Sequence, residues 1–216
     1  EGIEAIFHDA GHLFGSSSIE VILTENNIKK NIIFSGDIGN LNQPIIRDPE
    51  YLNNADYVVM ESTYGDRNHV NTPDFAAELA GIIDRTLSKG GNVVIPSFAV
   101  GKTQELLYFL REIKEKRLVK SNPNFPVFVD SPLAMKATQI YQGDLTGYLD
   151  EEAIKIVRNK VNPLKFENLN LCETTDDSKA LNENTEPKVI ISSSGMCEAG
   201  RIRHHLKHNL WREDCS

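Results

Sequence analysis

Short apolar runs alternate with segments of helical periodicity along the second half of the chain, between residues 92 and 210. The strand-like runs are the β-branched Asn92–Ile95, Pro126–Asp130, a weaker run at Leu169–Cys172, and Lys188–Ser192. The helix-like segments are Thr103–Lys116, Leu133–Tyr141, Glu151–Lys160 and Arg201–Leu210. Such a βαβ series predicts a parallel sheet with helices on its faces and right-handed crossovers.

The first seventy residues have a different pattern, of short strands and turns. The predicted strands are Ile3–Phe7, Ser18–Thr24, Ile32–Ser35 and Tyr57–Glu61, and Asn26-Asn27 tolerates the positive φ of a hairpin turn. A helix is expected from a Thr72 cap and Pro73 to the stop at Gly90-Gly91, and Glu173–Pro187 is expected to be a polar loop. We therefore predict an α/β chain with two domains, residues 1–70 and 71–216.

Charge and composition narrow the class of protein. The net charge of −8 and a pI close to 5.3 argue against a protein that coats nucleic acid, although the segment GRIRHHLKHNLWR forms one local basic cluster. No apolar run approaches the ~18 residues of a membrane span, and no signal peptide is visible. Three widely spaced cysteines suggest neither a disulfide framework nor a zinc ribbon. We expect a soluble, cytoplasmic protein with no membrane partner.

Two loops of the first part carry residues that suit metal binding. One is His8-Asp9-Ala10-Gly11-His12, and the other is Ser35-Gly36-Asp37-Ile38-Gly39, directly after a strand. Rigid strand ends fix such ligands, and glycine lets the backbone approach an ion. Taken singly, an Asp in this place is more often a turn residue, and a His more often a structural one.

The order of the motifs adds a resemblance. The segments AGHLFGSSSIEV, FSGDIG and DYVVMESTYGDR, followed by GGNVVIPSFAVGKTQELLYFL, PVFVDSPLAMKATQIY and VIISSSGMCEAGRIRHHLKHNL, resemble the β-CASP branch of the metallo-β-lactamase superfamily over nearly the whole chain. The resemblance implies part of an αββα metallo-β-lactamase sandwich followed by a β-CASP domain with a mainly parallel sheet. It implies zinc-dependent hydrolysis of RNA.

Three residues match the family's catalytic motifs. By resemblance, His12 is a zinc ligand, Asp37 bridges two zinc ions, and Glu61 is the acidic residue that sits beside the metals and orients a histidine; His8 is not a ligand. The family's His-x-His-x-Asp-His motif and two downstream histidine motifs are absent from these 216 residues. We therefore expect a truncated piece that is inactive and metal-free by itself, since two ligands rarely hold zinc.

RNA is expected at the carboxyl ends of the parallel strands, where ligands of open α/β sheets bind. The predicted contacts are hydroxyls, amides and basic groups of the loops at that edge: Lys102, Ser131, Ser193, Ser194, Gly195, Arg201, His204 and His205. Phe98 or Tyr64 could stack a base, but we expect Phe98 to be a core residue.

Three functional hypotheses follow. The first is a metal-dependent RNA nuclease, for which homodimer formation stays open. The second is a non-catalytic RNA-binding or scaffold subunit of an RNA-processing complex. The third, another superfamily hydrolase such as a thioesterase or lactamase, needs a fold without the inserted α/β half, which argues against it.

Overall fold

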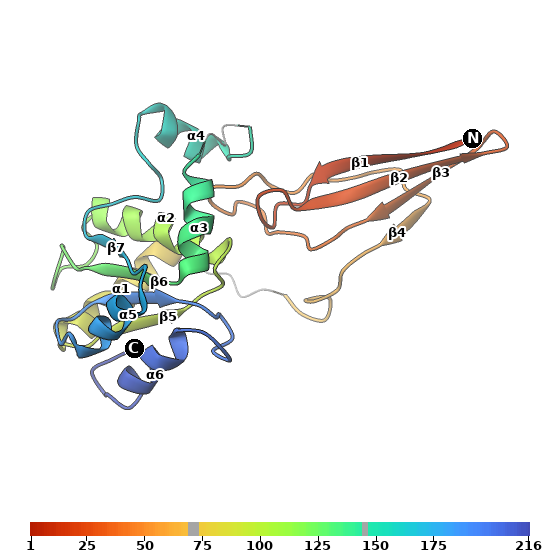
Figure 1. The fold of residues 1–216 in the computed structure, drawn as a ribbon. Helices are drawn as coiled ribbons and strands as arrows, with labels where there is room; N and C mark the ends of the chain where they lie inside the picture. Colours follow the sequence, from red (N-terminus) through yellow and green to blue (C-terminus); the bar gives the residue numbers. More distant parts are fainter. Residues whose placement is uncertain (69–73, 144–146) are drawn as a thin grey trace. The chain divides into compact units, whose positions relative to one another are not determined.

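The computed structural model describes residues 1–68, 74–143 and 147–216, which divide into two compact units (Figure 1). The units are Glu1–Asn71 with Thr146–Asn159, and Thr72–Leu145 with Lys160–Ser216. The predicted boundary near residue 70 therefore overlooked one segment, around residues 147–159, that returns to the first unit. Ile46 forms a β-bridge with Leu149, and the Ile45 amide donates to the Asp150 carboxylate at 2.7 Å.

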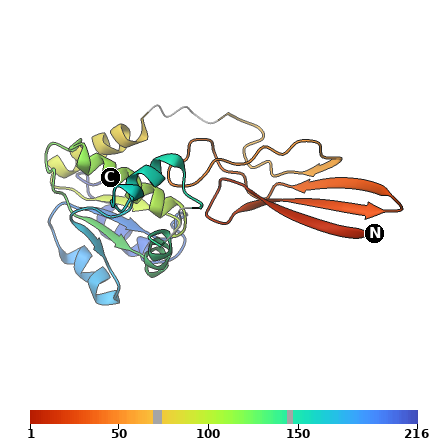
Figure 2. The same ribbon diagram turned by 90° about the horizontal axis from the view of Figure 1, so that it is seen from above.

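The first unit is built on a four-stranded sheet of order β1-β2-β3-β4 (Figure 2). The strands are β1 Gly2–Asp9, β2 Ser17–Glu25, β3 Ile28–Phe34 and β4 Tyr57–Val59. Pairing is antiparallel from β1 to β3 and parallel between β3 and β4. The β2–β3 turn holds Asn26 and Asn27 at φ of 50° and 64°, as predicted. The unit also contains the short helix α4, Glu151–Arg158.

One face of this sheet is apolar and open to solvent. The strand register aligns Phe7 with Ile19 and Ile19 with Phe34, so their side chains share a face. Ile3 and Phe7 on that face are 77% and 69% exposed. Within the described residues of this unit, this apolar face of the sheet is therefore left uncovered.

The second unit contains a fully parallel sheet of order β5-β8-β6-β7. The strands are β5 Val93–Pro96, β6 Val127–Asp130, β7 Leu169–Leu171 and β8 Val189–Ser192. The predicted parallel sheet is confirmed. The two central strands are almost wholly apolar and buried, as parallel strands covered on both faces must be.

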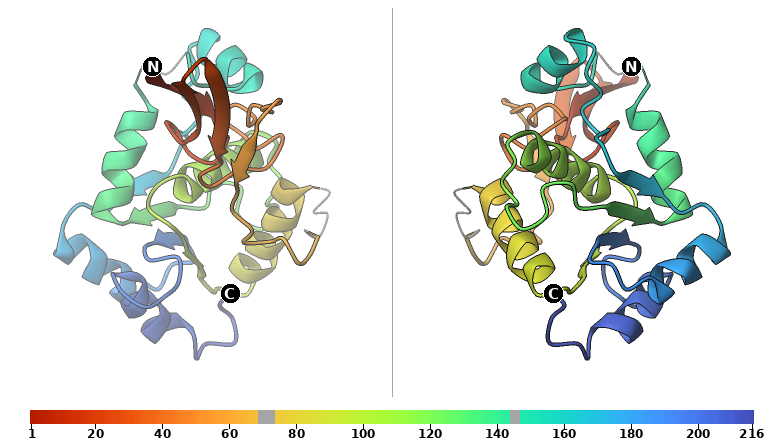
Figure 3. Two further views of the ribbon diagram at one scale, coloured as in Figure 1. Left: turned by 90° about the vertical axis from the view of Figure 1, so that its right-hand side faces the viewer. Right: turned by 90° about the vertical axis from the view of Figure 1, so that its left-hand side faces the viewer.

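Helices cover both faces of the parallel sheet (Figure 3). They are α1 Phe75–Ser88, α2 Lys102–Glu115, α3 Pro132–Tyr141, α5 Thr175–Glu183 and α6 Ile202–Asn209. The chain runs from β5 through β6 to β7 with α2 and α3 on one face, and then returns to β8 through α5 on the other, where α6 also lies. Right-handed crossovers require this change of face when the direction of travel reverses. No helix of the described part is long and apolar enough to cross a membrane.

Two local predictions need correction. The segment Glu173–Pro187 is not only a loop, because α5 forms within it. Thr174 and Asp177 make a reciprocal capping box there, which starts a helix that buries only two of its residues. The N-cap of α1 is Asp74, whose carboxylate accepts from the Ala77 amide at 2.9 Å, and the predicted Thr72 cap lies outside the described residues.

Candidate functional site

The loop of His12 and the loop of Asp37 touch backbone to backbone at the end of the first sheet. The Gly39 amide donates to the Ala10 carbonyl at 2.8 Å. A Cβ atom at Gly39 would lie 1.7 Å from the Gly11 carbonyl oxygen and 2.7 Å from the His12 amide nitrogen. Only glycine allows this approach, so the sequence SGDIG brings the Asp37 loop against the His12 loop.

Glu61 lies against the Asp37 loop. Its Oε1 accepts from the Ile38 amide at 2.8 Å, its Oε2 accepts from the Thr63 hydroxyl at 2.7 Å, and its own amide donates to Ser35 Oγ at 3.0 Å. The hydrogen bond from Ile38, then that from Thr63, lowers the pKa of Glu61, and the charge of His12 acts in the same direction. The carboxylate is therefore ionised and fixes the residue that follows Asp37.

The His12 ring and the Asp37 carboxylate are exposed, and neither has a hydrogen-bond partner within residues 1–68, 74–143 and 147–216. Imidazole and carboxylate suit zinc, so the donor atoms fit part of a metal site. Structural and catalytic zinc sites take at least three protein ligands. The described residues contain no group of three His, Cys, Asp or Glu side chains that could hold a metal, so this pair fits zinc only as part of a larger ligand set.

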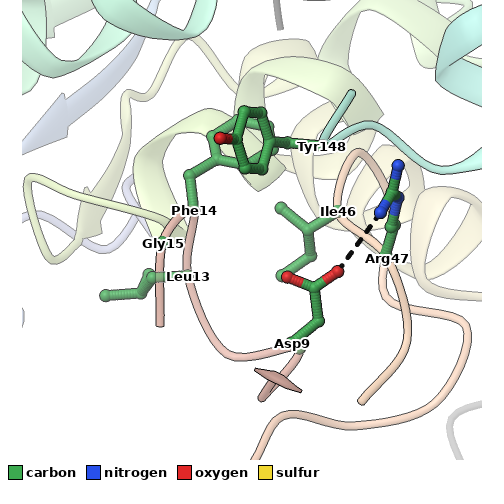
Figure 4. A pocket seen from close by; sticks show the side chains of 8 residues that line it. Asp9, Leu13, Phe14, Gly15, Ile46, Arg47 and Tyr148 are labelled. Atoms are coloured by element: carbon green, nitrogen blue, oxygen red, sulfur yellow. Dashed lines mark hydrogen bonds and ion pairs between the residues drawn. The ribbon is translucent and has the colours of Figure 1, made fainter. Parts of the chain in front are cut away.

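Neighbouring polar groups are occupied by structural contacts. His8 lies between Glu50 and Glu20, with Nδ1 3.0 Å and Nε2 2.9 Å from their carboxylates, and Glu50 contributes most to raising its pKa. Arg47 pairs with Asp9 at 3.4 Å beside a cavity of about 10 Å³ (Figure 4). That volume holds about one water molecule, so this cavity is too small for a nucleotide.

In the second unit, three loops meet at the carboxyl ends of the strands. Ser193 Oγ donates to Ser131 Oγ at 2.8 Å, and Ser192 Oγ donates to the Asp130 carbonyl at 2.8 Å. The Ser194 amide donates to the Ala199 carbonyl at 3.2 Å, so this amide serves the loop itself. The structure thus brings two of the predicted phosphate contacts, Ser131 and Ser193, side by side.

A buried carboxylate organises the basic end of this site. Asp130 is fully buried and accepts from Arg201 Nη1 at 2.6 Å and from Ser178 Oγ at 2.5 Å, while His205 Nε2 lies 2.6 Å from its Oδ2. Burial alone would raise the pKa of Asp130, but the hydrogen bonds from His205, Ser178 and Arg201 outweigh it and the pKa is lowered. Asp130 therefore joins β6, α5 and α6 through one charge.

This network corrects one predicted contact. His205 has no exposed surface, and its other ring nitrogen lies 3.0 Å from Asn182 Oδ1, so its ring does not reach RNA. Arg201 is partly exposed, but both of its Nη atoms have partners, since Nη1 donates to Asp130 and to the Cys172 carbonyl and Nη2 donates to the Glu173 carbonyl at 3.4 Å. His204 is exposed, and the exposed Lys102 ammonium pairs with Glu105 at 2.5 Å.

Two residues were misjudged or missed in the sequence. Phe98 was expected in the core but is 56% exposed, and Asp130 was not singled out although it ends a buried strand just before Ser131. The signal that could have indicated Asp130 is a carboxylate at the end of an apolar parallel strand, together with an Arg and a His after β8, the neighbouring strand in the sheet. Tyr64 is also 56% exposed, with the Arg67 guanidinium 5.8 Å from its ring centroid.

Comparison with known proteins agrees with this architecture. The chain is 38% identical over 204 residues to ribonuclease TTHA0252 of Thermus thermophilus, covering 94% of this chain and 45% of that protein. It is 29% identical over 210 residues to an RNase J-like protein of Methanocaldococcus jannaschii, covering 96% and 46%. It is 26% identical over 208 residues to endoribonuclease YSH1 of Kluyveromyces lactis, covering 95% and 26%. The chain spans less than half the length of each of these relatives.

The family model of the Beta-Casp domain matches residues 103–216, which is more than half of the chain. The resemblance seen in the sequence motifs is thereby confirmed. The chain belongs to the β-CASP family of the metallo-β-lactamase superfamily.

Proposed function

We propose that this chain is part of a longer protein that hydrolyses RNA phosphodiester bonds with bound zinc and acts in RNA processing. The relatives named ribonuclease and endoribonuclease support the reaction class. The observation that carries the proposal is the backbone contact of Gly39 with Gly11 and His12, because it sets two zinc-type donors on adjoining loops. Three free cysteines agree with a reducing, cytoplasmic setting.

The residues of this chain have distinct roles in the proposed reaction. His12 and Asp37 offer the nitrogen and oxygen donors that would hold zinc, together with ligands from outside the described residues. Bound zinc would supply an activated water and neutralise charge on the phosphate oxygens. Glu61 stays ionised and holds the Ile38 amide, so its part is to position Asp37 rather than to touch RNA.

The second unit would hold the RNA strand. The half-buried Ser193 hydroxyl lies beside the N-terminal end of α3, a place that favours an anion, where the buried Ser131 Oγ caps the helix and accepts from both Ser193 and the Ala134 amide. Ser194 and Gly195 follow Ser193 in the same loop, and we expect the exposed Lys102 and His204 and the partly exposed Arg201 to add charge or donors from the first turns of α2 and α6. Only a few phosphates would be contacted, so a chain of net charge −8 can still bind RNA at this local site. Because phosphate contacts release counterions, the affinity for RNA should fall as the salt concentration rises.

A scaffold role is the second candidate. It is favoured by the finding that no three metal-binding side chains come together in the part of the chain that the structure describes. A scaffold would bind RNA without cutting it. The two candidates differ in zinc content and in the fate of the bound RNA.

The test is cleavage of a labelled single-stranded RNA by the full-length protein, with zinc content measured by mass spectrometry. We expect stoichiometric zinc in the wild type. We expect Asp37→Asn to lower the zinc content, and to lower the rate of cleavage by at least about 100-fold. Asp66→Asn is the matched control, because Asp66 is exposed in the same unit and pairs with the exposed Arg67. Cleavage by Asp37→Asn at the wild-type rate would contradict the enzyme proposal, and RNA binding without cleavage by the wild type would favour the scaffold.

A further inference from the structure

The exposed ring of Phe98 stands where β5 ends, on a fixed backbone. Its carbonyl accepts from the Thr103 amide at 3.2 Å and from the Thr103 hydroxyl at 2.7 Å. The amide of the preceding Ser97 donates to the Ser192 carbonyl at 3.0 Å. A phenylalanine that is 56% exposed on so constrained a backbone presents its ring to solvent without the usual gain from burial.

The ring lies against the serine-rich loop after β8. A Cβ atom added to Gly195 would be 3.1 Å from Cδ2 and Cε2 of Phe98 and 3.1 Å from its amide nitrogen. Any larger residue at position 195 would therefore press on the ring. Glycine here lets the loop that carries Ser193 and Ser194 pass beside Phe98 and leaves the remaining ring surface open.

The surroundings combine apolar and hydroxyl groups at one edge of the sheet. Val100, Leu133 and Met196 follow β5, β6 and β8 and are 40%, 61% and 70% exposed. The paired hydroxyls of Ser131 and Ser193 belong to the same strand ends. An aromatic face next to anion-favouring hydroxyls and helix N-termini matches a nucleotide, which has an apolar base face on one side and a phosphate on the other.

We propose that Phe98 stacks a base of a single-stranded RNA while the adjoining serine loop receives a phosphate of the same strand. The inference rests on the proposed function and deepens it by naming a residue that would contact a base of the bound strand. Bases inside a duplex are stacked on each other and cannot offer a face to the ring, so Phe98 is a specificity-determining residue.

The test measures binding of a fluorescent single-stranded RNA to the full chain by anisotropy, in a series where each nucleotide in turn is made abasic. One stacked base contributes about tenfold or more to affinity. We expect Phe98→Ala to weaken binding by about tenfold and Phe98→Tyr to retain it. One abasic position should weaken wild-type binding by a similar factor and have no effect on Phe98→Ala.

Two further variants control for unrelated losses. Ile140→Ala removes an apolar side chain that is 67% exposed on α3, and it should leave the affinity unchanged. Phe98→Leu keeps apolar volume but removes the aromatic ring, and it should bind as weakly as Phe98→Ala. Folding of each variant is checked by thermal unfolding, and the exposed position makes a large change unexpected.

The outcomes separate the two proposals. RNA binding by the wild type with equal affinity for Phe98→Ala would overturn this inference alone and leave RNA binding in place. Full retention of RNA affinity by Phe98→Leu would also overturn it, because an aliphatic side chain lacks the aromatic face on which a base stacks. A wild type that binds no single-stranded RNA would overturn both this inference and the proposed function.

Discussion

Replacing the buried Asp130 by Ala should destabilise the second unit more than single substitutions at its surface do. The carboxylate is fully buried and accepts from Arg201 and Ser178, and it contacts the fully buried His205 ring. Removing one partner of a buried ion pair costs about 3–5 kcal/mol, and here the buried His205 ring and the buried Ser178 hydroxyl also lose their acceptor. At about 3 °C per kcal/mol for a domain of this size, the unfolding midpoint should fall by roughly 10–15 °C.

The assay is thermal unfolding followed by circular dichroism, with a matched control on the neighbouring helix. Asp176→Ala removes a carboxylate that is 92% exposed and pairs with Lys179 at 3.4 Å, so the midpoint should stay within error of the wild type. Asp130→Asn keeps the shape of the side chain and one acceptor oxygen, so its unfolding midpoint should lie between those of Asp130→Ala and Asp176→Ala. A loss below about 1 kcal/mol for Asp130→Ala would refute the claim that this carboxylate joins β6 to α5 and α6.

The same variant makes a pH prediction. The pKa of Asp130 is lowered in the folded state, so its contribution is complete above the unfolded value of about 3.9 and is lost as the pH falls through the folded value. The stability difference between wild type and Asp130→Asn should therefore be constant near neutral pH and shrink below about pH 4. A difference that grows on acidification would have the wrong sign.

Two further predictions concern the first unit. The pKa of His8, measured by NMR titration, should lie above its ordinary value. Glu50→Gln should lower this pKa more than Glu20→Gln does, because the hydrogen bond to Glu50 is the larger cause of the raised pKa. A larger effect of Glu20→Gln would contradict these contacts. Gly39→Ala should reduce zinc content in the full-length protein, because its Cβ would meet the Gly11 backbone, whereas Gly147→Ala meets nothing within 4 Å and should retain zinc. An unchanged zinc content in Gly39→Ala would show that zinc binding does not depend on the backbone contact between the His12 loop and the Asp37 loop.

The periodic elements were predictable because their signals are local. The β-branched run at Val93–Pro96 and the apolar spacing of α2 each identify an element without knowledge of the rest of the chain. The α5 helix escaped prediction since its apolar content is low and its start depends on the Thr174 capping box. The segment with Leu149 and Asp150 joins the first unit through contacts about a hundred residues away, which periodicity cannot reveal.

The candidate site divides in a similar way. The neighbourhood of His12, Asp37 and Glu61 could be expected from strand ends and from the family motifs. The burial of His205 and the exposure of Phe98 could not, because each depends on a tertiary partner, namely Asp130 for the histidine and Gly195 for the ring. A basic residue within a sequence cluster of basic residues is therefore not always a surface residue.

The most direct test of the metal proposal is anomalous X-ray diffraction at the zinc edge from crystals of the full-length protein. The proposal predicts a zinc peak with the His12 ring nitrogen about 2.0–2.1 Å away and an Asp37 carboxylate oxygen about 2.0–2.2 Å away. A zinc peak bound elsewhere, with both side chains outside coordination distance, would contradict it.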